Sequence, residues 1–147
     1  MNKGMSLIVK TVTRLTIWII LLYGIYIILH GHLTPGGGFA GGVVIALALL
    51  NVTLAYGREF VEKWLRLPIV EHVESVCSLA YLLIGILGIL WGGAFFVNFL
   101  SKGELFHLIS AGTLPILNII IGLKVAVSLF LVVWVIAAVR VSKGESA

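Results

Sequence analysis

Four long apolar runs restrict this chain more than any other feature of its sequence. They cover residues 15–29, 39–56, 76–97 and 114–139, and the last is interrupted only by Asn118, Lys124 and Ser128. A helix needs about 20 residues to cross about 30 Å of hydrocarbon. An open strand in lipid would leave its backbone polar groups without partners, so each run is expected to be a helix.

Composition supports a membrane protein. Hydrophobic residues make up 61% of the 147 residues and charged residues 11%, whereas soluble domains average about 45–50% and about 25%. We therefore predict an all-α membrane protein. It forms one four-helix transmembrane domain over residues 1–147, with helices at about 9–31, 37–56, 73–99 and 114–140. The basic start of the first run resembles that of a signal peptide, but we expect a retained helix because no small-residue cleavage site follows closely.

The basic residues predict the orientation. Eight of the ten lie before the first run, between the second and third, or after the fourth, and Lys102 is the one on the opposite side. Cytoplasmic loops carry an excess of Lys and Arg, so both termini are expected in the cytoplasm of a multi-pass cell-membrane protein. The basic residues form no patch, which argues against nucleic-acid binding despite a pI of about 9.5.

The loop between the second and third runs has an amphipathic pattern. Phe60, Val61, Trp64 and Leu65 share one helical face, with Glu59–Lys63 and Glu62–Arg66 paired at i,i+4. We expect a short helix on the membrane surface that ends at Pro68. Glu71 and Glu74 follow and are expected to be solvated residues at the edge of the third helix.

A glycine-rich segment joins the first two runs. Pro35 enforces a turn or a helix start, and glycines recur at i,i+4 in two stripes, which permits close helix contacts. We interpret it as a structural turn and packing surface; its residues are Pro35, Gly36, Gly37, Gly38, Phe39, Gly41 and Gly42.

The fourth run holds the second notable pattern. Pro115 suits a helix start, Asn118 and Gly122 share a face, and Lys124 lies too deep to reach either membrane surface easily. A lysine at mid-membrane costs about 2.5–3.5 kcal/mol, so it is expected to be paired or used. Two interpretations stay open: a tether for assembly, or a group in a proton or ion path with Ser128, Asn118 and His32. None of the four runs contains an acid, so a counter-charge is expected from another chain.

No catalytic site and no bound cofactor are expected. No nucleophile–base pair or cofactor motif is present, and Cys77 is the single cysteine. His30, His32 and His107, the last near Glu104, are spaced too loosely to predict a metal site.

Residues 31–42 (GHLTPGGGFAGG) and 115–124 (PILNIIIGLK) together resemble the B subunit of Mrp/Mnh-type multisubunit Na⁺/H⁺ antiporters. The same subunit type occurs in archaeal membrane-bound hydrogenases and sulfur-reducing complexes. The resemblance implies an accessory subunit that does not transport alone. Its partners would be small and large antiporter-type subunits, with or without a hydrogenase-like redox arm. The alternative from the residues is a self-sufficient homo-oligomeric channel or carrier, in which a ring of Lys124 would favour anions.

Overall fold

The computed structural model describes residues 5–100, 103 and 111–145, and only the backbone of residues 138–145. In this part of the chain there are five helices: α1 (Leu7–Leu29), α2 (Gly37–Tyr56), α3 (Arg58–Trp64), α4 (Leu67–Gly92) and α5 (Leu114–Glu145). Helices α1, α2 and α4, and the stretch Leu114–Ala137 of α5, are each long and apolar enough to cross a membrane. The predicted all-α, four-span architecture is confirmed. Lys102, Glu104 and His107 lie outside the described residues.

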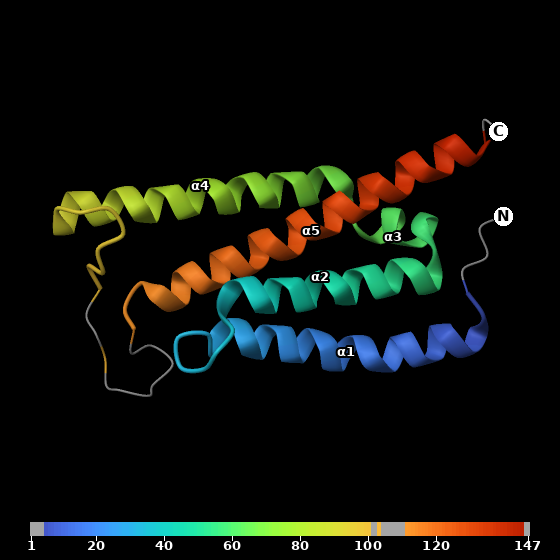
Figure 1. Ribbon diagram of the computed structural model, residues 1–147, viewed down its shortest axis with the longest axis horizontal. Coiled ribbons are helices and arrows are strands. Elements are labelled where there is room, and N and C mark those ends of the chain that lie inside the picture. The colour runs from blue at the N-terminus through green and yellow to red at the C-terminus, as the bar shows by residue number, and fades with distance from the viewer. Residues whose placement is uncertain (1–4, 101–102, 104–110, 146–147) are drawn as a thin grey trace.

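The helices form an up-and-down bundle (Figure 1). Helix α2 lies between α1 and α5 and packs along both, whereas α4 packs along α5 on the opposite side. Helix α1 starts, and α5 ends, at the end of the bundle that carries α3, so the two termini share one side. The basic residues predict that this side is cytoplasmic.

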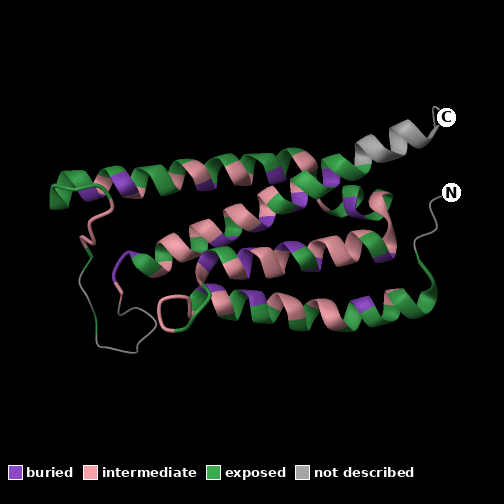
Figure 2. Cartoon of the chain, in the orientation of Figure 1, coloured by how far each residue is buried: buried purple, intermediate pink, exposed green. Residues whose placement is uncertain are grey.

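Most large apolar side chains face outward, as expected for a protein dissolved in lipid. Figure 2 shows exposed residues along the outer faces of α1 and α4. In α4 the buried residues are Val70, Cys77, Gly85 and Gly88. Soluble monomers rarely expose apolar surface on this scale, and four long apolar stretches can each cross a membrane, so the chain is a multi-pass membrane protein.

Helix α4 begins and ends earlier than predicted. The sequence indicated 73–99, but the helix covers Leu67–Gly92. Pro68 stands in its first turn, where a missing N–H costs nothing, so it starts this helix rather than ending the previous one. At the other end Gly93 adopts the left-handed conformation, with φ of 76°, and stops the helix.

The apolar residues after Gly93 fold back onto α4 instead of extending it. The amide of Phe96 donates to the carbonyl of Gly85 at 3.4 Å, and a Cβ on Gly88 would stand 2.8 Å from the amide nitrogen of Val97. The small residues of this helix therefore accommodate the chain's own returning segment.

The short helix α3 is partly embedded. Phe60 and Trp64 are 49% and 71% exposed, as a surface helix would require. Val61, however, is buried with Val70, Phe130 and Trp134. Glu62 pairs with Arg58 at 3.1 Å rather than with Arg66, because the helix ends at Trp64 and leaves Arg66 outside it. The predicted Glu59–Lys63 pair is not formed among the described residues.

Candidate functional site

The turn between α1 and α2 is built around the carbonyl of His30. The amides of Leu33 and Thr34 donate to it at 2.8 and 2.9 Å, and the Thr34 hydroxyl at 3.1 Å. Gly36 and Gly37 then have φ of 146° and 86°, backbone angles that residues with a Cβ rarely adopt. These two residues allow the chain to reverse tightly and begin α2.

The two sequence motifs meet in space. A Cβ on Gly38 would overlap the backbone carbonyl of Asn118, and one on Gly42 would stand 2.6 Å from the carbonyl oxygen of Gly122. The side-chain amide of Asn118 also lies against Gly31, where a Cβ would stand 2.9 Å from its Nδ2. The backbones of α2 and α5 are thus in direct contact near the starts of the two helices.

Gly41, between Gly38 and Gly42, faces α1 instead. A Cβ on Gly41 would stand 2.7 Å from the carbonyl oxygen of Gly24. Pro35 and Phe39 are exposed, with Phe39 65% accessible, so they lie outside these contacts. The motif is therefore a two-sided packing surface whose apolar Phe39 points outward. Pro115 is partly buried in the first turn of α5, the helix that Gly38 and Gly42 contact.

Lys124 and Ser128 lie in the middle of α5, both partly buried. The hydroxyl of Ser128 donates to Oε1 of Glu74 on α4 at 2.8 Å. Glu74 is thus part of the helix contact and not the solvated edge residue that was expected. Lys124 has no carboxylate within ion-pair distance, since the one ion pair in the described part of the chain joins Arg58 and Glu62.

A family model described as a domain related to the MnhB subunit of Na⁺/H⁺ antiporters matches residues 8–131, which contain the second and third spans in full and most of the first and fourth. The chain belongs to the MnhB family. The resemblance inferred from the two motifs is confirmed.

Two individual proteins are similar to about two thirds or more of this chain. The chain is 33% identical over 97 residues to the B subunit of the Na⁺/H⁺ antiporter of Bacillus subtilis, covering 66% of this chain and 67% of that protein. It is 39% identical over 112 residues to an uncharacterized protein of Methanocaldococcus jannaschii, covering 72% of this chain and 42% of that protein.

A solved structure also matches this MnhB chain. It is the membrane-bound sulfane sulfur reductase, an archaeal respiratory membrane complex, with a TM-score of 0.67 and 32% identity over 88% of this chain. The chain spans 56% of that structure's matching chain, and about two fifths of the M. jannaschii protein.

His32 is separated from Lys124 along the bundle. His32 is partly buried in the turn before α2, while Lys124 lies ten residues, or about 15 Å, along α5 from its start at Leu114. Asn118 is close to this turn through Gly31 and Gly37. The four candidate ion-path residues therefore form two groups, and Lys124 with Ser128 is the deeper one.

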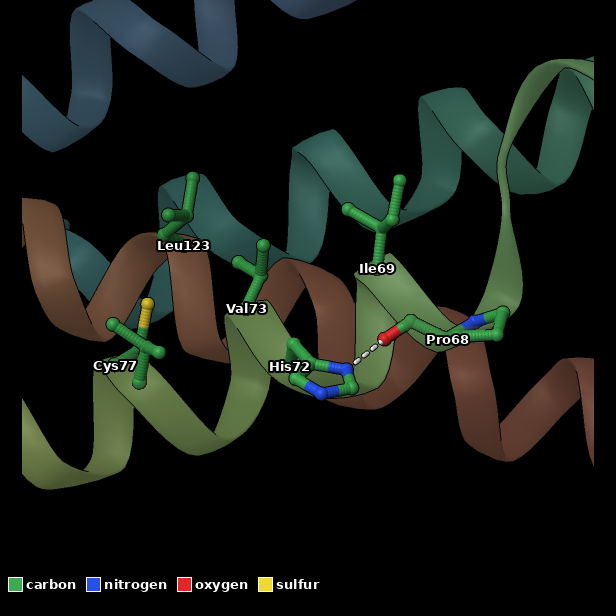
Figure 3. Close-up of a pocket in the computed structure, with 7 residues that line it drawn as sticks. Pro68, Ile69, His72, Val73, Cys77 and Leu123 are labelled. Carbon is green, nitrogen blue, oxygen red and sulfur yellow. Dashed lines mark hydrogen bonds between the residues drawn. The ribbon is translucent and has the colours of Figure 1, made fainter.

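Two hollows flank α4 near this deeper group. One, of about 560 Å³, is largely apolar; its lining includes Pro68, Ile69, His72, Val73, Cys77 and Leu123 (Figure 3). There the ring Nδ1–H of His72 donates to the carbonyl of Pro68. The other, of about 500 Å³, is lined by Glu74, Ser75, Ser78, Leu79 and Leu82. The second hollow is the more polar one and borders Glu74.

Glu74 is the site residue that sequence reasoning missed. If Pro68 ends the surface segment, the two acids fall at the edge of the membrane helix, where they are solvated. The same proline in the first turn of a helix is an ordinary start signal, and it would have placed Glu74 two turns inside the span.

No group of three or more potential metal ligands occurs among the described side chains.

Proposed function

We propose that this chain is a small accessory membrane subunit of a multisubunit Na⁺/H⁺ antiporter module, stand-alone or as the ion-pumping arm of a respiratory complex. The match of the MnhB family model to residues 8–131 is the observation that carries the proposal. The similarity to a chain of the archaeal sulfane sulfur reductase complex supports the second setting.

The packing supports a dependence on partners. Helix α4 contacts α5 along one side, and much of its remaining surface is exposed, including Leu79, Leu82, Leu90 and Trp91. In an antiporter module these faces would contact the other small and large antiporter-type subunits, and a hydrogenase-like redox arm where one is present. Any redox cofactor would then be held by those partners rather than by this chain.

Lys124 is the residue we assign to the ion path. It lies within the span Leu114–Ala137, partly buried, on the side of α5 that carries Ser128. A cation at this depth is costly unless it is paired or titrates. In the module it would accept and release a proton or balance the charge of a passing ion.

Purification of the tagged native chain in a mild detergent, with mass spectrometry of the proteins that accompany it, tests the subunit assignment. Antiporter-type subunits alone indicate a stand-alone exchanger, and additional iron–sulfur or hydrogenase subunits indicate a respiratory complex. A homo-oligomer that conducts anions in liposomes would establish the channel alternative instead.

Lys124→Ala in the assembled complex tests the role of the lysine. We expect Na⁺-dependent proton movement in vesicles to fall by about 100-fold, the contribution usual for a positioned proton-transfer group. Lys63→Ala is the matched control, because Lys63 is exposed at the end of α3. Full assembly with full antiport in Lys124→Ala would reject the ion-path role.

A further inference from the structure

The contact between Ser128 and Glu74 is a polar link inside an otherwise apolar helix pair. The Ser128 hydroxyl donates to Oε1 of Glu74 at 2.8 Å, across 54 residues of sequence. Glu74 lies seven residues, or about two helical turns, inside α4, which begins at Leu67. A carboxylate at this position in a membrane helix is unfavourable unless it is neutral or compensated by a nearby charge.

The closest compensating charge on the facing helix is Lys124. Residues 124 and 128 are spaced i,i+4 and therefore share one face of α5, so Lys124 lies one turn from the residue that binds Glu74. A lysine side chain can extend over such a distance. The other titratable side chains in this stretch of the two helices are Glu71, His72 and Cys77.

Two of these three side chains have other surroundings, whereas Cys77 lies within electrostatic reach of Lys124. Glu71 and His72 are exposed, and the His72 ring donates to the carbonyl of Pro68 in its own helix. Cys77 is buried beside the apolar hollow of Figure 3. Glu74 is the carboxylate that the structure joins to the face of Lys124.

We propose that Glu74 exchanges a proton with Lys124 through the hydroxyl of Ser128, an inference that rests on the proposed function. In the forward step an N–H bond of the Lys124 ammonium breaks and the proton passes to the Ser128 oxygen. The Ser128 proton passes to Glu74, where an O–H bond forms. The charged pair thereby becomes a neutral amine and a neutral acid, and the reverse step restores both charges. A hydroxyl can serve because it both donates and accepts.

The hollow beside Glu74, an open groove on α4, offers this proton a way out of the helix pair. Its lining residues, Glu74, Ser75, Ser78, Leu79 and Leu82, all belong to α4. Its volume of about 500 Å³ exceeds that of several water molecules, each of which occupies about 30 Å³ in the liquid. Glu74 thus connects the α5 face that carries Lys124 to a surface of α4 that a partner subunit would cover.

Glu74→Gln in the native complex is the central test, with Glu71→Gln as the matched control. Both remove one carboxylate from α4, but Glu71 is exposed and its side chain makes no hydrogen bond across the described helices. We expect Glu74→Gln to assemble and to lose antiport in vesicles by about 100-fold, and Glu71→Gln to retain the wild-type rate. Ser128→Ala should also lose antiport, because it removes the hydroxyl that donates to Glu74.

Infrared difference spectra of the purified complex between two pH values separate proton exchange from a structural role. A carboxylic-acid C=O band that is absent in Glu74→Gln and shifts its midpoint pH in Lys124→Gln supports the proposal. Unchanged antiport in Glu74→Gln, or a band insensitive to Lys124→Gln, overturns it.

Three further outcomes are decisive. If Glu74→Gln fails to assemble, the double variant Glu74→Gln/Lys124→Gln is compared with it: restored assembly supports the coupling of the two charges, and continued failure overturns it. If Lys124→Ala loses antiport while Glu74→Gln keeps it, this inference fails and the proposed function stands. Absence of antiporter subunits from the wild-type preparation rejects the proposed function itself.

Discussion

The backbone carbonyl of Asn118 lies so close to Gly38 that a Cβ at position 38 would overlap it. Gly38 and Asn118 belong to the two motifs noted in the sequence, which are about 80 residues apart. Their contact places the α1–α2 turn directly against the start of α5. Since Lys124 lies further along the same helix, the glycine motif fixes the position of the helix that carries the candidate ion-path lysine.

Gly38→Ala is expected to destabilise the bundle by about 1–3 kcal/mol, the usual cost of overpacking. The direction is informative, because alanine in a helix is intrinsically favoured over glycine by about 1 kcal/mol. Only the loss of space against Asn118 can reverse that preference. Thermal unfolding of the purified complex in detergent, followed by circular dichroism, measures the change.

Leu47→Ala is the control on the same helix. Leu47 is 57% exposed, so its truncation removes surface that faces lipid or a partner and leaves the contact with α5 unchanged. We expect a change below that of Gly38→Ala. A Gly38→Ala complex as stable as wild type would show that α2 and α5 do not approach this closely in the membrane.

The sequence predicted the spans and the role of the glycines, but not which helix each stripe contacts. Hydropathy identifies a helix that can cross a membrane, and i,i+4 glycines identify a face that permits close approach. Neither identifies the partner, because small residues accept any helix. The pairing of Gly42 with Gly122 and of Gly41 with Gly24 is a property of the folded bundle.

The ends of α4 were predicted poorly for a related reason. Residues 94–97 are apolar, so the hydropathy signal continues after the helix has stopped at Gly93. Near the other end, Pro68 is compatible with either the end of one helix or the start of the next. The two interpretations place Glu74 either at the edge of the membrane helix or two turns inside it. The contact of its carboxylate with Ser128 depends on tertiary packing.

Asn98 is expected to be essential for the connection into α5. Its Nδ2 donates to the carbonyl of Ala111 at 3.1 Å, and its Oδ1 accepts from the Thr113 amide at 3.1 Å. Asn98→Ala would leave the amide of the buried Thr113 without this acceptor, a loss of about 1–3 kcal/mol. A lower unfolding temperature and faster proteolysis of the purified complex would report it.

Thr113→Val is the comparison for Asn98→Ala. It removes only the hydroxyl, which donates to Oδ1 of Asn98 at 3.3 Å, and keeps the backbone amide bond. We expect a loss of about 1 kcal/mol or less. Equal losses in the two variants would contradict the assignment of Asn98 as the centre of this connection.

Arg58 is expected to hold α3 against the bundle chiefly through Trp134. Its guanidinium carbon lies 4.6 Å from the centroid of the Trp134 ring, and its Nε donates to Glu62 at 3.1 Å. Arg58→Ala should cost about 0.5–1 kcal/mol from the lost cation–π contact. Glu62→Gln should cost less, since exposed ion pairs contribute about 0–1 kcal/mol and are screened by salt.

Unfolding of the Arg58→Ala and Glu62→Gln complexes at low and high salt distinguishes the two contacts. A loss in Arg58→Ala that persists at high salt supports the contact with the ring. If high salt removes it, the ion pair with Glu62 is the dominant contact.

The end of α4 predicts an order of stability among three glycine variants. Gly93 has φ of 76° and nothing within 4 Å of a Cβ, so Gly93→Ala would incur only the conformational cost of about 1–2 kcal/mol. Gly93→Asn should cost less, because asparagine tolerates the left-handed conformation. Gly88→Ala should cost the most, since its Cβ would stand 2.8 and 2.9 Å from the amide nitrogens of Val97 and Phe96, which are backbone atoms. Unfolding temperatures of the three purified complexes check the order, and a Gly88→Ala complex more stable than Gly93→Ala would show that the 94–97 segment does not fold back onto α4.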